Sequence, residues 1–450
     1  MKFITIALFI LASMTSCSTT QLPFTDSKVK LITLDPGHFH AALVQKSMYN
    51  DIDTNVYVYA PEGADVIGHL NRIEGYNNRP EQPTHWNEIV YRGADFFKRM
   101  LDEKKGNVVI LAGNNQKKTE YIKASVEAGF NVLADKPMAI TSDDFLVLKE
   151  SFDVAQQKGL LVYDMMTERS EITTILQREL SFDEDLFGIL EKGSPENPGI
   201  TKESVHHFYK YVSGAALKRP AWFFDTDQQG EGITDVTTHL VDLIQWECFP
   251  EQIIDYTRDI EIVTARRWAT QITPSSFREI TSLDGYPEYL SKDIKDSTLL
   301  VKANGAFDYK IKGVFARVSV IWNFKAPEGT GDTHYSILRG TKANLIIRQG
   351  KEQNFKPALY IEPVDKMDSS ILRGSIVKIQ MKYPGMEIKK SGTGWEVIIP
   401  EKYRVSHEEH FAQVTERFLK YLKEGKLPDW EVPNMLAKYY TTTQALNFAE

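Results

Sequence analysis

An aspartate and a histidine in segment 230–246 have the types and the spacing of a proton-transfer pair. Asp235 and His239 lie four residues apart in a stretch whose apolar residues recur at helical spacing, which predicts that both side chains share one helix face. A carboxylate beside an imidazole orients the ring and supports its charged form, as a general base requires. Because such pairs are common by chance, the meaning of this one depends on the elements around it.

A ligand-binding domain of the α/β class is predicted upstream of this helix. Short apolar strands alternate with helices, which indicates a doubly wound parallel sheet that binds ligands beyond the carboxyl ends of its strands. The polar segment 68–86 is interpreted as a loop. Strands are expected at residues 29–34, 55–59, 107–112, 131–134 and 160–163, and helices from about residue 41, over 117–128 and over 142–157.

The second half of the chain has a different pattern. Residues 314–324 alternate strictly between the two faces of a strand, and residues 336–348 have the pattern of a hairpin. Ser406 and Glu409 form a capping box for a helix that runs to about Lys423. These features predict an open-faced, largely antiparallel sheet in an α+β domain.

Three motifs, in chain order, resemble those of the glucose–fructose oxidoreductase, inositol dehydrogenase and MocA family (Gfo/Idh/MocA). Residues 108–121 resemble its fourth strand and the following loop, residues 131–138 its strand-end Glu-Lys-Pro signature, and residues 232–242 its helix motif. The residues that carry the resemblance are Asn115, Asp135, Lys136, Pro137, Gly232, Asp235, His239 and Asp242.

The resemblance implies a Rossmann-like domain at residues 28–166, a substrate-binding and oligomerisation domain at 167–450, and a bound NAD or NADP. It implies that Lys136 contacts the reacting hydroxyl and the nicotinamide ribose, that Asp235 holds the hydroxyl, and that His239 accepts its proton. Elementary chemistry agrees, because a positioned base contributes ~10²–10⁴ in rate and an ammonium stabilises the developing alkoxide. Pro137 fixes the backbone that aims the lysine.

The phosphate-binding loop departs from the family pattern. The family's G-x-G-x-x-G is replaced by DPGHFH at residues 35–40, so Asp35 stands where a glycine is expected and only Gly37 aligns. Glu62 is the nearest acidic candidate for the ribose hydroxyls, and no Arg or Lys occurs between residues 56 and 70, which favours NAD over NADP. The predicted cofactor-binding residues are Asp35, Gly37, His38, Glu62, Asn115, Asp135, Lys136 and Pro137.

Further candidates for substrate binding lie before the helix motif. Arg219, Trp222 and Asp225 resemble a carbohydrate-binding rim, with a hydrophobic plug between domains as the alternative. Lys210 or one of the neighbouring histidines at 206 and 207 could reach the substrate, with a role on the sheet surface as the alternative. The predicted substrate-binding residues are Lys210, Arg219, Trp222, Asp235 and His239.

No metal is predicted. The sequence has no zinc-ligand spacing, catalytic serine elbow or Walker loop. His38 and His40 are expected to face the cofactor or cap a helix rather than to form a metal pair, and His407 and His410 are expected to be solvated.

The N-terminus and the overall charge indicate where the protein acts. The chain has 450 residues and a net charge of −8 without a basic patch, which argues against a nucleic-acid partner. Residues 1–17 combine a short apolar run with small residues before Cys17, which resembles the lipobox of bacterial lipoproteins; an ordinary signal with a chance cysteine is the alternative. Lipidation of Cys17 and a tether at 18–27 would give an exported protein held to a membrane by its lipid anchor, facing the periplasm.

Three functions are compatible with these observations. The leading hypothesis is an NAD-dependent oxidoreductase acting on a sugar, glycoside or related polyol, with homodimers or homotetramers formed through the C-terminal sheet by analogy with the family. Because free dinucleotide is scarce outside the cytoplasm, the alternative is a redox-neutral, NAD-dependent glycosidase that regenerates its bound cofactor in each turnover. A non-catalytic carbohydrate-binding lipoprotein on the same fold is the third hypothesis, suggested by Asp35.

Overall fold

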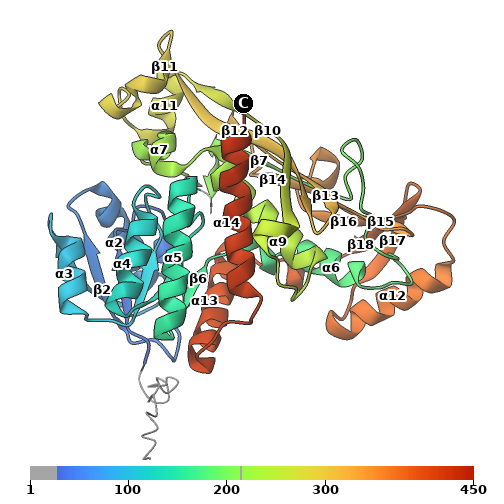
Figure 1. The fold of residues 1–450 in the computed structure, drawn as a ribbon, viewed down its shortest axis with the longest axis horizontal. Coiled ribbons are helices and arrows are strands. Elements are labelled where there is room, and N and C mark those ends of the chain that lie inside the picture. The colour runs from blue at the N-terminus through green and yellow to red at the C-terminus, as the bar shows by residue number, and fades with distance from the viewer. Residues whose placement is uncertain (1–27, 213–214) are drawn as a thin grey trace, which may run out of the picture.

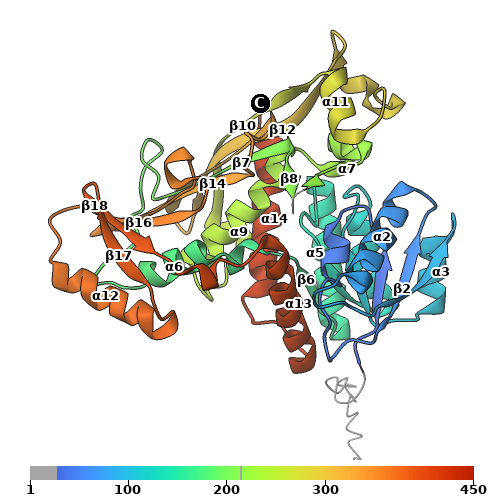
Figure 2. The same cartoon turned by 180° about the vertical axis from the view of Figure 1, so that it is seen from behind.

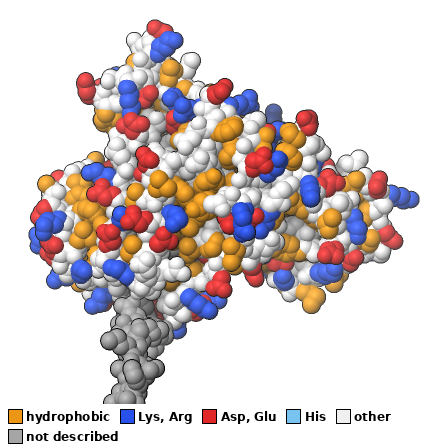
Figure 3. Space-filling view, in the orientation of Figure 1, with side chains coloured by type: hydrophobic (Ala, Val, Ile, Leu, Met, Phe, Trp, Pro, Cys, Tyr) orange, Lys and Arg blue, Asp and Glu red, His pale blue; other side chains and the backbone are white. Residues whose placement is uncertain are grey.

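The computed structural model describes residues 28–212 and 215–450, which form a parallel sheet followed by a mixed sheet (Figure 1; Figure 2 shows the reverse view). Cys17, the predicted signal segment and the tether lie outside the described residues. Within the described ranges, no helix has the length and apolar character needed to cross a membrane. Side chains of both charges are interspersed over the face drawn in Figure 3.

The first sheet has six parallel strands in the order β3-β2-β1-β4-β5-β6, which confirms the predicted doubly wound, Rossmann-like fold. The strand order reverses between β1 and β4, where ligands bind in such sheets. The strands are β1 (Leu31–Leu34), β2 (Asn55–Ala60), β3 (Asn87–Arg92), β4 (Val108–Leu111), β5 (Asn131–Ala134) and β6 (Val162–Asp164). The helices are α1 (His40–Leu43), α2 (Ala64–Asn78), α3 (Phe96–Glu103), α4 (Lys118–Ala128) and α5 (Ser142–Lys158).

The segment interpreted as a loop is helical in its first half, where the prediction was wrong, and irregular over residues 79–86, as predicted. Helix α2 covers its first half, with Val66, His69 and Ile73 buried on one face at helical spacing. Glycines and asparagines with low helix propensity obscure this pattern, and burial against the sheet overrides the propensity. Strand β3 and helix α3 follow, and neither was predicted.

The second sheet has ten strands and is antiparallel except between β13 and β7, which confirms the predicted largely antiparallel C-terminal sheet. The alternating segment is β13, and the predicted hairpin is β14 with β15. The strands are β7 (Ile200–Tyr209), β10 (Ile260–Ile272), β11 (Ile294–Lys295), β12 (Thr298–Ile311), β13 (Val314–Lys325), β14 (Thr333–Arg339), β15 (Ala343–Arg348), β16 (Ala358–Pro363), β17 (Glu387–Ser391) and β18 (Gly394–Ile398). A separate pair is formed by β8 (Tyr211–Val212) and β9 (Ala215–Ala216).

The last two helices return to the first domain. Helix α14 stands between the two sheets, next to α5 (Figure 1). Phe411, Phe418 and Tyr439 belong to the same hydrophobic core as strands β1, β4 and β5. The predicted capping box of Ser406 and Glu409 is present at the start of α13. The remaining helices are α6 (Ile172–Ser181), α7 (Thr226–Gln229), α8 (Gly232–Asp235), α9 (Thr237–Cys248), α10 (Tyr256–Asp259), α11 (Pro274–Thr281), α12 (Ser369–Lys382), α13 (His407–Glu424) and α14 (Glu431–Phe448).

Candidate active site

A cavity of about 570 Å³ lies between the carboxyl ends of the parallel strands and one face of the second sheet. Its wall includes the loop before α1, the end of β5, the short helix Glu168–Ser170, strand β7, helices α8 and α9, and the first turn of α13. Lys136, Asp235 and His239 all line it. The fold therefore brings the three predicted catalytic side chains to one space of a size suited to a small ligand.

Lys136 and Asp235 form a buried ion pair at the cavity wall. Nζ of Lys136 donates to Oδ1 of Asp235 over 2.5 Å, and the side chains are only 12% and 7% exposed. Lys136 is the second residue after β5 and is joined to Pro137 by a cis peptide bond, whereas Asp235 ends α8. A Cβ on Gly232 would lie 1.9 Å from the carbonyl oxygen of Ala303 on β12, so glycine allows α8 to pack this closely against the sheet.

His239 lines the same cavity, but the expected pairing with Asp235 does not form. The N–H of His239 donates to the carbonyl of Val236, three residues back, so a tighter turn separates α8 from α9. Among the described residues, Nδ1 of His239 has no hydrogen-bond partner, because Asp235 faces Lys136 instead. Burial and the charge of Lys136 hold the pKa of His239 well below its ordinary value of 6.5. The ring is therefore neutral near pH 7 and can accept a proton.

Asp242, the last residue of the helix motif, faces away from the cavity into a buried charge network. Its carboxylate accepts two hydrogen bonds of 2.7 Å from Arg169 and one of 2.9 Å from Lys438. Arg169 also donates to Glu431, and Lys438 pairs with Asp164 at the end of β6. The network joins β6, α9 and α14, and so fixes the helix that carries His239.

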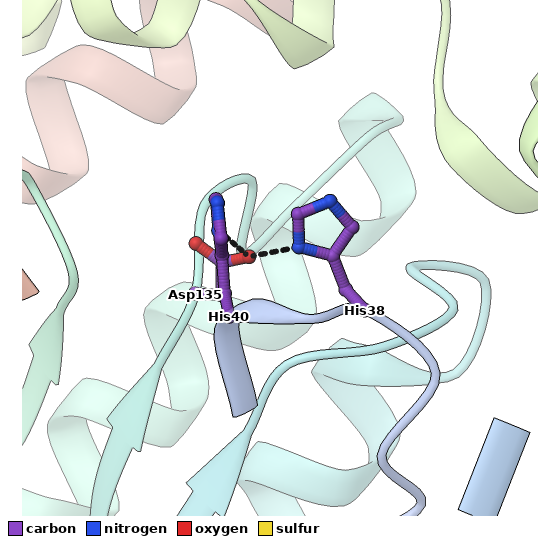
Figure 4. A group of neighbouring side chains, drawn as sticks. All are labelled: His38, His40 and Asp135. Carbon is purple, nitrogen blue, oxygen red and sulfur yellow. Dashed lines mark hydrogen bonds and ion pairs between the residues drawn. The ribbon is translucent and has the colours of Figure 1, made fainter. Parts of the chain in front are cut away.

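His38, His40 and Asp135 meet at the strand ends (Figure 4). Nδ1 of His40 lies 2.9 Å from Oδ2 of Asp135, and Nδ1 of His38 lies 3.6 Å from the same oxygen. One ligand atom from each residue lies within 4.8 Å of the others, a spacing that could hold a metal ion. Lys118, whose Nζ donates to the carbonyl of Asp135, and the neighbouring Lys136 place two ammonium groups beside the cluster, which disfavours a divalent cation. We therefore interpret the cluster as a hydrogen bond between His40 and Asp135 with the His38 ring beside it.

The loop expected to bind the pyrophosphate, residues 35–40, packs against the end of β4. The backbone N–H groups of Gly37 and His38 both donate to the carbonyl of Ala112. Trp222 and Asp65 stand over the loop: a Cβ on Gly37 would lie 3.2 Å from each, and Nε1 of Trp222 donates to Asp65 over 2.9 Å. Trp222 therefore covers this edge and does not line the cavity.

Two acidic candidates flank this edge. Asp35 has a φ of 47°, which a glycine would adopt without strain, and accepts a hydrogen bond from the Tyr121 hydroxyl. Burial raises the pKa of Asp35. Glu62 is exposed and lies 3.6 Å from the guanidinium of Arg92, which ends β3. Arg92, which lies outside residues 56–70, is therefore next to Glu62, the residue predicted to bind the ribose hydroxyls.

The described residues fit the nicotinamide half of a dinucleotide. Three buried polar atoms without hydrogen-bond partners gather at this end of the sheet, namely Oδ1 of Asn115, Oδ1 of Asp135 and Nδ1 of His38. Ribose hydroxyls and a carboxamide group would supply partners for such atoms, which are costly to leave unpaired. Asn115 also donates to the carbonyl of Gln229 over 2.7 Å, so α7 covers the end of β4.

Of the other substrate-binding candidates, two line the cavity. Lys210 forms an ion pair with Asp332, and Arg219 is buried with its guanidinium over the Trp322 ring. Asp225 instead bonds Lys292 and does not line the cavity. Of this segment, Arg219 lines the cavity, whereas Trp222 contacts Asp65 of the first domain.

Several residues of the cavity were missed or misplaced by the sequence analysis. Glu168 lines it, and burial together with the charge of Glu171 raises the pKa of Glu168 to about 7. His407 and His410 also line the cavity, and His410 is buried rather than solvated. The missed residues of the cavity include Glu168, Ser204 and Asp332.

Comparisons with known families divide the chain at the same place as the two sheets. Residues 54–164 match the family described as "Oxidoreductase family, NAD-binding Rossmann fold", and residues 176–450 match "Putative oxidoreductase C terminal domain". A search of curated proteins finds no match.

Solved structures share the whole architecture. A crystal structure from Parabacteroides merdae, described as a "putative oxidoreductase", is 60% identical and covers 95% of this chain and 99% of that chain, with a TM-score of 0.93. A 3-ketoreductase from Actinomadura kijaniata, in complex with NADP, is 14% identical, covers 94% and 98% of the two chains and has a TM-score of 0.57. A levoglucosan dehydrogenase, in complex with NADH and levoglucosan, is 13% identical, covers 93% and 97%, and has a TM-score of 0.58. The last two show a common fold.

Proposed function

We propose, because this chain belongs to the Gfo/Idh/MocA family of NAD(P)-binding oxidoreductases, that it transfers hydride between a carbinol carbon of a sugar, glycoside or related polyol and a bound nicotinamide. The observation that carries the proposal is the convergence of Lys136, Asp235 and His239 on one cavity. An ammonium, a carboxylate and a neutral imidazole are the groups that the oxidation of an alcohol requires.

Each of the three side chains has a separate task in this proposal. The ammonium of Lys136 stabilises the charge that develops on the carbinol oxygen as its proton leaves. Asp235 keeps that ammonium in place and can accept a hydrogen bond from the same hydroxyl. His239 takes the hydroxyl proton in the oxidation and returns it in the reduction, since the ring is neutral in the free protein.

The cofactor proposed is NAD. When bound, it would accept the hydride from the carbinol carbon and give it back in the reverse reaction. Asn115, Asp135 and His38 would hold its nicotinamide half through the polar atoms that lack partners. NADP differs from NAD by a 2′-phosphate, which a nearby cation would bind. NAD is favoured because Arg92, the cation next to the predicted ribose-binding residue, is already paired with Glu62.

The purified full chain tests this function directly. We expect mass spectrometry of the denatured protein to detect NAD, or calorimetry to detect its binding, and we expect at least one sugar, glycoside or polyol to reduce the bound nicotinamide. A protein that binds carbohydrate but binds no dinucleotide would refute the oxidoreductase and favour the non-catalytic alternative.

Asp35→Asn is expected to strengthen dinucleotide binding. Asp35→Asn keeps the size of the side chain and an oxygen for the Tyr121 hydroxyl, but removes a carboxylate next to the pyrophosphate loop. Removing one repulsive charge should lower the Kd for NAD about tenfold, which corresponds to about 1.4 kcal/mol. Calorimetric titration measures the change, and weaker binding by the variant would show that Asp35 supports the cofactor instead of repelling it.

The protonation of His239 is expected to depend on Lys136. Because burial and the Lys136 charge both disfavour the imidazolium, NMR titration of the wild type should show His239 neutral until the pH falls well below 6.5. Lys136→Met removes one of these two causes, so the titration midpoint should move to higher pH. A wild-type midpoint at or above 6.5, or a downward shift in the variant, would contradict this electrostatic account.

We also propose export and lipidation at Cys17, on the strength of the N-terminal sequence pattern. The mature protein would then face the periplasm on a lipid anchor, and copies of the C-terminal sheet would pair to give a homodimer or homotetramer. Metabolic labelling with a fatty acid should mark the wild type and not Cys17→Ser. Equal labelling of the two proteins would rule out this anchor.

A further inference from the structure

A serine, a histidine and an aspartate form a continuous hydrogen-bonded chain on the sheet wall of the cavity. Oγ of Ser204 lies 2.7 Å from Nε2 of His206, and Nδ1 of His206 lies 3.0 Å from Oδ2 of Asp332. All three residues line the cavity that Lys136 and His239 also line. None of the three belongs to the motifs that carry the family resemblance.

The second sheet builds this arrangement. Ser204 and His206 are two residues apart on β7 and so share a face, and Asp332 immediately precedes β14, which pairs with β7. Trp322 lies opposite His206 on β13 and stacks on its ring, with the ring centres 5.0 Å apart. The imidazole is thus held by an aromatic face and by two hydrogen-bonding partners.

Asp332 sets the tautomer of His206. Burial opposes its charge, but His206, His207 and Lys210 hold the pKa of Asp332 well below its usual range. The carboxylate therefore accepts the Nδ1 hydrogen of His206, which leaves a lone pair on Nε2 for the hydroxyl hydrogen of Ser204. In this arrangement Ser204 can take a proton from a substrate while its own proton passes to His206.

A proton-transfer role suits this site better than acyl transfer does. Ser204 lies within β7, which is paired with β13 on one side and with β14 on the other. The neighbouring backbone N–H groups are engaged in these ladders. A tetrahedral acyl intermediate at Ser204 would therefore lack the N–H donors that its oxyanion requires, whereas a proton relay needs none.

We propose that Ser204, His206 and Asp332 form a second acid–base site, which removes the proton from the carbon adjacent to the ketone formed at the first site. The C–H bond breaks, its electron pair forms the C=C bond of an enolate whose oxygen lies at Lys136, and the proton passes through Ser204 to His206. Where the next carbon bears an alkoxy group, the enolate re-forms the ketone as an enone, the C–O electron pair leaves with the alkoxide, and His206 returns the proton to give an alcohol. The inference rests on the proposed function and names glycosides as the substrate class.

The test supplies the ketone directly, so that it does not depend on the first step. Methyl glucosides that carry a ketone at each secondary ring carbon in turn are incubated with the full chain in deuterated buffer. Mass spectrometry then measures deuterium at the adjacent carbon, and gas chromatography measures released methanol. The wild type should exchange and eliminate at least one of these ketones.

Matched variants assign the activity to the site. His206→Gln can keep both hydrogen bonds but cannot carry a proton, so exchange and elimination should fall about 10²–10⁴-fold. His85→Gln, on the exposed loop before β3, should retain the wild-type rate. Thermal unfolding verifies that each variant is folded, and Ser204→Ala replaces His206→Gln if the latter is not.

Three results would overturn the second site. The first is exchange at the wild-type rate in His206→Gln, and the second is no exchange by the wild type on any of the ketones. Covalent labelling of Ser204 by a fluorophosphonate would also overturn it, because the residue would then be a nucleophile. Failure of the proposed function has a different signature, in which the wild type exchanges the ketones but no alcohol reduces the bound nicotinamide.

Discussion

Replacement of His239 by alanine is expected to slow the oxidation of the sugar about 10²–10⁴-fold, while NAD still binds. The imidazole lines the cavity with Lys136, and among the described residues its Nδ1 has no hydrogen-bond partner. The variant therefore loses the proposed proton acceptor but leaves the Lys136–Asp235 pair in place. The measurement is the single-turnover rate of nicotinamide reduction at saturating substrate, with a separate titration of cofactor affinity.

His85→Ala is the matched control, since this histidine is exposed on the loop before β3. It should oxidise the sugar at the wild-type rate. If His239→Ala did the same, the proton acceptor would have to be another group of the cavity. Glu168, whose pKa is raised to about 7, and His407 would be the next to replace.

Asp242→Asn is expected to lower the free energy of unfolding by about 3–5 kcal/mol. The carboxylate of Asp242 is buried between Arg169 and Lys438, and both cations remain in the variant without their shared anion. Because these cations also contact Glu431 and Asp164, the loss should loosen α9 and α14 together. Chemical denaturation followed by circular dichroism measures the effect.

An exposed ion pair provides the control for this prediction. Asp153 pairs with Lys149 on the surface of α5, and both side chains are largely exposed. Asp153→Asn removes the same charge and should cost less than about 0.5 kcal/mol. Equal losses for the two variants would mean that Asp242 owes its effect to net charge and not to its buried partners.

Much of the frame around the site follows from local sequence patterns. Strand β5 has the predicted bounds, since a short apolar run next to Asp135-Lys136-Pro137 is bounded by polar and turn residues. The capping box of α13 and the β14–β15 hairpin were likewise predicted from residues that lie next to one another in the chain. Lys136 and His239 could be selected because their motifs are local.

Contacts between distant segments were not predictable in this way. The rule that pairs residues four apart assumes an unbroken helix, and the turn at Val236 removes that condition between Asp235 and His239. Asp332 belongs to no recognisable sequence motif. Its possible role becomes visible only in the sheet, where it lies beside His206. The covering of the phosphate loop by Trp222 likewise depends on how the two domains pack.

Transfer of a deuterium label tests the central claim most directly. Sugars and glycosides deuterated at their carbinol carbons are incubated with the full chain carrying bound NAD. The nicotinamide cofactor is then recovered, and mass spectrometry measures its deuterium content. If Lys136 and His239 act on one carbinol beside the nicotinamide, the label appears in the cofactor of the wild type and is strongly reduced in His239→Ala. A protein that retains NAD and binds these sugars, yet never transfers the label, would contradict the account.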